Sequence, residues 1–127
     1  MMDLRGTLME ALGMEVIKQQ TDIVEIKMPV NEKTRQPMGY LHGGASVALA
    51  ESAASIGALA NVDSSKYQIF GIEINANHIK SKQGGWVIAR ATPVHIGRKT
   101  MVWQINIIDE ADKLIATSRC TIGVIEL

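Results

Sequence analysis

One acidic residue stands out because of its surroundings. Glu51 lies within residues 45–60, a run of about sixteen residues rich in Ala, Ser, Leu and Ile that carries no other charge. A carboxylate is costly to bury in apolar surroundings unless it is paired or does chemistry, so Glu51 is a candidate catalytic acid or base. The alternative is an exposed glutamate on an amphipathic helix, but the run has no companion charges that would mark a solvated face.

The residues just before this run could supply the second half of a reaction centre. His42, Gly43 and Gly44 end a polar loop, residues 31–44, and a helix is expected to begin there. The first N–H groups of a helix have no partner within the helix. Near a carboxylate that acts as nucleophile or base, such N–H groups can polarise a carbonyl as an oxyanion hole.

Several other kinds of reaction centre are excluded by missing motifs. The sequence has no HExxH, no CxxC pair, no GxxxxGK[ST] and no GxGxxG. Residues 53–57 loosely match a nucleophile elbow, but that motif needs a strand-turn-helix corner, and Ser55 is expected inside a helix. The single cysteine, Cys120, excludes a disulfide framework and a Cys-rich zinc site, and is expected to be a small buried side chain. We expect no bound metal and no cofactor.

The hydrophobic pattern predicts the elements that position these residues. Residues 3–12 are expected to form a short helix, followed by two strands, the second within residues 21–30. Residues 44–61 contain no proline and are expected to form one long helix. Four strands with period-two alternation follow, at residues 67–79, 85–96, 99–109 and 113–125. The prediction is one α+β domain, residues 1–127, whose antiparallel sheet wraps around the long central helix.

Composition narrows the class of protein. The chain has 127 residues, of which 46% are hydrophobic and 4% aromatic, so one domain with an aliphatic, methionine-rich core is expected. Thirteen basic residues balance 13 acidic ones, so no general attraction to nucleic acid or to a membrane is expected. The N-terminal residues lack the apolar run of a signal peptide, and no stretch approaches the ~20 apolar residues of a membrane span. We therefore expect a cytoplasmic protein.

Residues 36–52, QPMGYLHGGASVALAES, resemble the signature of the hotdog-fold thioesterases. They are most similar to the branch that holds 1,4-dihydroxy-2-naphthoyl-CoA hydrolase, the enterobactin-pathway proofreading thioesterase and the Arthrobacter-type 4-hydroxybenzoyl-CoA thioesterase. The similarity continues through residues 71–78, 93–98 and 102–105, and so covers nearly the whole chain. The loop-helix motif and its spacing are specific, whereas the later strands only support it. The resemblance implies a hotdog fold and the hydrolysis of an acyl-CoA thioester.

The resemblance also implies a role for five residues. Glu51 matches the catalytic carboxylate, which is argued for different family members to be a nucleophile or a general base on water. Gly43 matches the residue whose backbone N–H polarises the thioester carbonyl. Gln36 and His42 match side chains that orient the thioester and the water, and Ser55 matches a hydroxyl one turn beyond the carboxylate. In the family, the site forms between two subunits, so a homodimer or homotetramer with shared active sites is expected.

A place for the CoA nucleotide is implied in the same way. His78, Lys80 and Ser81 lie at the end of one expected strand, and Arg98 follows a neighbouring one. In the family this region holds the nucleotide at the surface. Cations at strand ends are commonly only solvated, so a surface without a ligand is the alternative.

Other functions remain open at this point. A hotdog domain can be a non-catalytic acyl-CoA binding or regulatory module, and a purely structural oligomer would leave Gln36, His42 and Glu51 without a role. Glu51 beside Gly43 favours hydrolysis, and the helix lacks the histidine of hotdog dehydratases. For the acyl group we expect an aromatic acid, with 1,4-dihydroxy-2-naphthoyl-CoA of menaquinone biosynthesis as the leading candidate. A thioesterase of broad specificity is the alternative.

Overall fold

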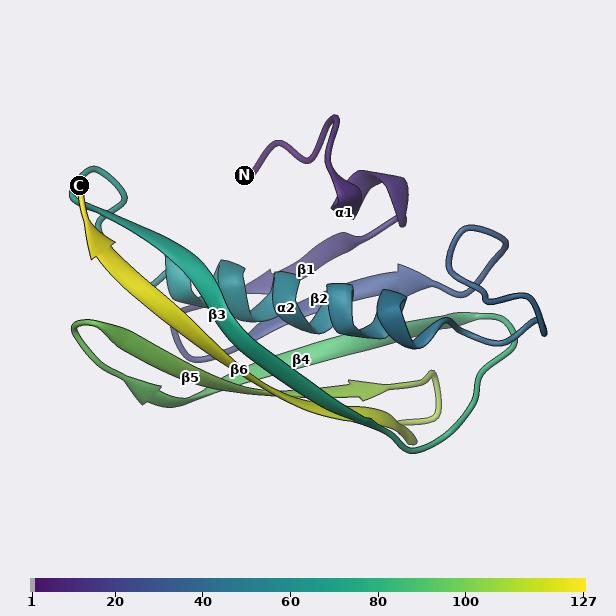
Figure 1. Ribbon diagram of the computed structural model, residues 1–127. Helices are drawn as coiled ribbons and strands as arrows, with labels where there is room; N and C mark the ends of the chain where they lie inside the picture. Colours follow the sequence, from purple (N-terminus) through teal and green to yellow (C-terminus); the bar gives the residue numbers. More distant parts are fainter. Residues whose placement is uncertain (1) are drawn as a thin grey trace.

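A computed structural model describes residues 2–127 (Figure 1). Its elements in chain order are α1 (Leu8–Ala11), β1 (Glu15–Gln19), β2 (Val24–Pro29), α2 (Gly43–Leu59), β3 (Tyr67–His78), β4 (Trp86–Ile96), β5 (Thr100–Ile108) and β6 (Leu114–Glu126). The long helix and the four long strands lie where the hydrophobic pattern predicted them. No helix in residues 2–127 is long and apolar enough to cross a membrane.

The six strands form one antiparallel sheet in the order β1-β2-β4-β5-β6-β3. α2 lies along the inner face of this curved sheet and contacts every strand from β2 to β6 (Figure 1). After β3 the chain leaves the edge of the sheet and returns to its interior at β4. The expected α+β arrangement is therefore confirmed, with β1 and β3 as the two edge strands.

The core lies between α2 and the sheet. Alternate side chains of β2, namely Val24, Ile26 and Met28, are fully buried on the inner face, as their alternation predicted. Small residues on α2 let the helix approach closely: a Cβ atom at Gly57 would lie only 2.6 Å from Cη2 of Trp103 on β5. The indole N–H of Trp103 is the only buried side-chain donor or acceptor in residues 2–127 without a partner. The helix and sheet are thus in direct contact at this point, without room for a larger residue.

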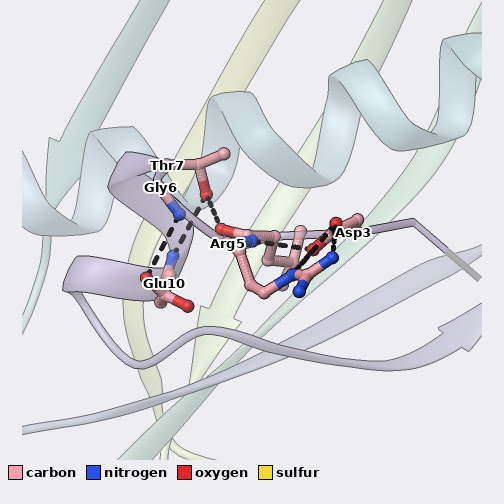
Figure 2. A network of polar contacts seen from close by, with 6 residues as sticks. Asp3, Arg5, Gly6, Thr7 and Glu10 are labelled. Atoms are coloured by element: carbon pink, nitrogen blue, oxygen red, sulfur yellow. Dashed lines mark hydrogen bonds and ion pairs between the residues drawn. The ribbon is translucent and has the colours of Figure 1, made fainter.

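The N-terminal helix is shorter than predicted, because local hydrogen bonds begin it late (Figure 2). The guanidinium of Arg5 donates to the carboxylate of Asp3, and Gly6 has φ +75°, so these residues are not helical. Thr7 is the N-cap: its Oγ1 accepts the N–H of Glu10 at 3.3 Å, while the Glu10 carboxylate accepts the N–H of Gly6 at 3.2 Å. This reciprocal arrangement fixes the start of α1 at Leu8 rather than at residue 3.

Strand β3 contains a bulge near its middle. Gly71 pairs with Ile122 of β6, and Ile74 pairs with Cys120. The two residues on β3 are three positions apart, but their partners on β6 are only two positions apart, so β3 contains one extra residue. Ile122 and Cys120 are both buried on the inner face of the sheet, so Gly71 and Ile74 lie on that face too, although Gly71 is itself exposed; Ile72 belongs to the inserted step. A bulge of this kind changes the twist of a strand and redirects its side chains.

The close contact between Gly57 and Trp103 predicts that Gly57→Ala destabilises the protein, although the same change usually stabilises a helix. Gly→Ala inside an exposed helix normally stabilises it by up to ~1 kcal/mol. We expect Gly57→Ala instead to lower the free energy of unfolding by about 1–3 kcal/mol, because the new methyl group overpacks the core. Urea denaturation measures this. Gly84→Ala, where no atom lies within 4 Å of the added methyl, is the control. An unchanged or raised value for Gly57→Ala would show that helix and sheet separate easily.

Candidate active site

His42 begins α2 and fixes its first turn. It is the N-cap residue, and its Nδ1 accepts the N–H of Gly44 at 2.8 Å. Its carbonyl oxygen accepts the N–H groups of Ala45 and Ser46. Because Nδ1 is an acceptor, the neutral ring carries its proton on Nε2 and presents a donor to solvent. This geometry suits a side chain that orients a ligand better than one that removes a proton.

Gly43, the first residue of α2, has a free N–H group. No acceptor for this N–H lies within residues 2–127. The residue lines a hollow that we call the helix-start hollow, whose lining includes Gln36, Gly43, Ser46, His78, Lys80 and Ser81. A Cβ atom at Gly43 would lie 3.0 Å from Nε2 of His78, so the imidazole packs directly against this glycine.

Gln36 is held in the helix-start hollow by its own loop. Its Oε1 accepts the N–H of Met38 at 2.6 Å and that of Tyr40 at 3.4 Å, and the Gln36 N–H donates to the carbonyl of Tyr40 at 2.8 Å. Gly39, with φ +92°, makes this tight turn possible. With its oxygen engaged, the side-chain NH₂ group of Gln36 remains available as a donor to a ligand.

Glu51 lies further along α2, in a second depression. This acid groove runs between α1 and α2, and its lining includes Leu8, Met9, Glu51, Ser55, Ile56 and Leu59. Glu51 is half-buried, and its carboxylate has no hydrogen-bond or ion-pair partner within residues 2–127. Ser55 lies one turn later on the same side, as the spacing predicted. Apart from Ser52, the other side chains that line the groove are apolar.

A single chain therefore separates the five predicted catalytic residues into two groups. Gln36, His42 and Gly43 lie at the start of α2, whereas Glu51 and Ser55 lie in the acid groove. At a rise of 1.5 Å per residue, Gly43 and Glu51 are about 12 Å apart along the helix axis. Reacting groups must come within about 3–3.5 Å of one another. In one chain, the N–H of Gly43 and the carboxylate of Glu51 therefore face two depressions that share no lining residue.

The predicted nucleotide-binding residues are also divided. His78, Lys80 and Ser81 all line the helix-start hollow, with Lys80 4.0 Å from the Asp109 carboxylate. Arg98 lies instead in a hollow at the other end of β3, beside Tyr67. The sequence did not predict that α1 lines the acid groove, because the apolar residues of so short a segment do not indicate which other element they pack against.

Cys120 takes no part in the hollow or the groove. It is fully buried on β6, and the pKa of its thiol is raised to about 12. The main cause is burial, and the negative charges of Glu51 and Glu73 add to it. The expectation of a small buried side chain is confirmed, since a neutral buried thiol is unreactive. Among residues 2–127, no three His, Cys, Asp or Glu side chains are grouped so that they could hold a metal ion.

Comparison with known proteins decides the family. Residues 38–116 match the model of the Thioesterase superfamily. The chain belongs to the thioesterase superfamily. Its fold is the predicted hotdog fold: the structure of thioesterase HI1161 from Haemophilus influenzae superposes with a TM-score of 0.93 and 42% identity, covering 98% of this chain and 86% of that one.

Two relatives of this thioesterase are similar over most of their length. It is 54% identical over 125 residues to ComA2 of Bacillus subtilis (strain 168), named as a candidate esterase, covering 98% of this chain and 99% of the relative. It is 50% identical over 117 residues to a 1,4-dihydroxy-2-naphthoyl-CoA hydrolase of Listeria monocytogenes serotype 1/2a (strain 10403S), covering 92% and 94%. The prediction of an acyl-CoA thioester hydrolase is confirmed.

The cap at His42 predicts a stability difference between two substitutions. His42→Ala removes the acceptor for the Gly44 N–H and should lower the free energy of unfolding by about 0.5–2 kcal/mol. His42→Asn supplies an oxygen that suits the same N-cap position, so its loss should be only a few tenths of a kcal/mol. Urea denaturation of both variants compares them. Equal losses for Ala and Asn would show that the cap is not what His42 contributes to the fold.

Proposed function

We propose that this thioesterase hydrolyses an aromatic acyl-CoA at sites shared by two chains, with 1,4-dihydroxy-2-naphthoyl-CoA of menaquinone biosynthesis as the leading candidate substrate. The main support for a shared site is that Gly43 and Glu51 of one chain line different depressions. The identity to the Listeria monocytogenes hydrolase supports the substrate, since that relative is named for this acyl-CoA.

Each of the five residues has a part in the proposed reaction. The carboxylate of Glu51 attacks the thioester carbonyl carbon or removes a proton from the water that attacks it. The N–H of Gly43 stabilises the negative charge that develops on the carbonyl oxygen. The NH₂ group of Gln36 and the Nε2–H of His42 orient the thioester and the water, and the Ser55 hydroxyl lies beside the carboxylate. The C–S bond breaks, and CoA leaves as its thiol after taking up one proton, which comes from the water. In the nucleophilic route, that water hydrolyses the mixed anhydride and restores the Glu51 carboxylate.

The free edge of β3 provides a way to bring two chains together. This strand carries exposed apolar side chains, with Phe70 43% and Ile72 54% exposed, and its outer edge has no neighbouring strand. Such an edge is a template for pairing with another strand. Antiparallel pairing of two β3 strands about a twofold axis sets the helix-start hollow of one chain towards the acid groove of the other. A homodimer, or a homotetramer made of two such dimers, then holds complete sites.

The same pairing accounts for the divided nucleotide-binding residues. Arg98 lies near Tyr67 at the beginning of β3, whereas His78 is at its end. In an antiparallel pair, the beginning of one β3 lies beside the end of the other. Arg98 of one chain and His78, Lys80 and Ser81 of the second chain can then contact the same CoA nucleotide.

The walls of the acid groove favour an apolar acyl group. Leu8 and Met9 of the N-terminal segment line the groove together with Ile56 and Leu59 of α2, and Glu51 lies in the same groove. An aromatic ring placed between these walls leaves its carbonyl carbon close to the carboxylate. Burial of the ring contributes binding energy of about 25 cal/mol per Å² of apolar surface.

The first functional prediction concerns Glu51. Glu51→Gln keeps the size of the side chain but removes the charge, so kcat should fall by about 10²- to 10⁴-fold with little change in KM or in the unfolding transition. Steady-state hydrolysis of an aryl-CoA measures this. Glu15→Gln, on the exposed edge strand β1, is the control and should keep the wild-type rate. A rate within tenfold of wild type for Glu51→Gln would refute the assignment.

The acyl group is tested with the same assay. Aryl-CoA and alkyl-CoA substrates are compared by kcat/KM, and 1,4-dihydroxy-2-naphthoyl-CoA should have the highest value. Similar values across the panel would indicate a thioesterase of broad specificity instead.

The second functional prediction concerns Gly43 and the shared site. Proline is accepted at the first position of a helix, and His42, with ψ 130°, already has the conformation that a residue before proline adopts. Gly43→Pro therefore removes the N–H while retaining the helix start, and kcat should fall about 10²- to 10³-fold. Gly43→Ala also meets the His78 ring but keeps the N–H, and it is the matched control.

Mixing the two inactive variants tests whether the site is shared. After unfolding and refolding together, Glu51→Gln and Gly43→Pro chains should form mixed dimers that each hold one intact site. Random pairing in equal amounts would restore about a quarter of the wild-type activity. No recovery, in a mixture shown by mass spectrometry to contain mixed dimers, would mean that each site lies within one chain.

A further inference from the structure

Gly71 lies directly against the carboxylate of Glu51. Its position on β3 faces α2, and a Cβ atom there would lie 2.5 Å from Oε2 and 3.4 Å from Cδ of Glu51. No other heavy atom in residues 2–127 lies within 4 Å of that position, apart from the immediate chain neighbours. The space that a side chain at residue 71 would fill is therefore the space that the carboxylate occupies.

The backbone gives no other reason for a glycine at this position. The φ angle of Gly71 lies outside the left-handed region, in contrast to Gly6, Gly13, Gly39 and Gly85. Any residue can adopt the conformation of Gly71, and glycine inside a strand costs roughly 0.5–1 kcal/mol relative to alanine. What glycine contributes here is the absence of a side chain beneath Glu51.

The bulge in β3 gives the contact its position. Gly71 is the last residue in regular register before the step that contains Ile72, after which Ile74 is the next residue that faces the core. The inner face of β3 is thus interrupted just where the Glu51 carboxylate reaches it. Bulges are frequent beside active sites, where they redirect side chains.

We propose that Gly71 is a positioning residue for the reaction: it leaves open the seat on β3 in which the Glu51 carboxylate is held towards the substrate. This inference rests on the proposed function, in which Glu51 is the catalytic carboxylate. The carboxylate has no hydrogen-bond or ion-pair partner within residues 2–127, so no polar contact fixes its position, and Oε2 lies in the space that a side chain at residue 71 would fill. A seat of this kind orients the acid without neutralising its charge.

The effect of a side chain at this position follows from the geometry. Gly71→Ala forces the carboxylate to move, because Cβ atoms do not approach other atoms to 2.5 Å. The atoms displaced are the flexible end of one side chain, so the fold should tolerate the change. Displacement of a reacting group by about 1 Å can lower a rate roughly 100-fold. We expect kcat to fall about 10- to 100-fold, with KM, the unfolding transition and the oligomeric state unchanged.

The test compares Gly71→Ala with one separate control variant and also introduces it into two Glu51 variants. Gly84→Ala, which adds a methyl group in open space, is the control and should have the wild-type rate. In a Glu51→Gln background, Gly71→Ala should cause no further loss, because it acts only through the carboxylate. In a Glu51→Asp background, whose shorter side chain withdraws the carboxylate from β3, Gly71→Ala should cost much less than it does in the wild-type enzyme.

The outcomes distinguish this inference from the function on which it rests. A Gly71→Ala enzyme within threefold of the wild-type kcat, or one that loses as much again in the Glu51→Gln background, overturns the role of Gly71. A loss of rate that follows lower stability or a changed oligomer by light scattering also overturns it, since the glycine would then be structural. If Glu51→Gln itself keeps the wild-type rate, both the catalytic role of Glu51 and the positioning role of Gly71 are refuted.

Discussion

The direct contact between α2 and the inner face of the sheet is the constraint on which the rest of the structure depends. Alanine, serine and glycine on the helix let its backbone approach Trp103, which leaves no space between the two layers. The helix is consequently held along its length, and the groups at its start and at Glu51 take fixed positions above β3. Functional groups on a rigid element keep their geometry better than groups on a loop.

That rigidity also explains why the chain requires a second copy for the proposed chemistry. A helix cannot bend to bring its first N–H to a side chain two turns later, so the donor and the acid face different depressions. In the proposed dimer, two copies related by a twofold axis would form two equivalent sites, and in each site the helix start and the acid would come from different chains. Chain association and catalysis are then linked by geometry.

Local patterns made most of the fold predictable, and long-range register accounts for most of the rest. The period-two strands and the long helix follow from side chains that are neighbours in sequence, and the separation of Gly43 from Glu51 follows from the helix rise alone. The length of α1 depends on the N-cap at Thr7, which a prediction from hydrophobic spacing does not include. The seat at Gly71 depends on how β3 pairs with β6 and on where α2 crosses them. Glycine within a strand pattern was its one visible sign.

The segment before β1 differs from the rest of the molecule in what holds it. Hydrogen bonds among neighbouring residues, such as Thr7 with Glu10 and Arg5 with Asp3, set its shape (Figure 2). Its apolar side chains line one side of the acid groove. Met9 and Leu12 of this segment also pack against the core, whereas Leu8 is 62% exposed, so a change at Leu8 leaves the packing of α2 on the sheet untouched. In the proposed site, a substitution at Leu8 would alter the wall that contacts the acyl group without moving Glu51. Substrate choice and catalysis would then depend on residues that can change separately.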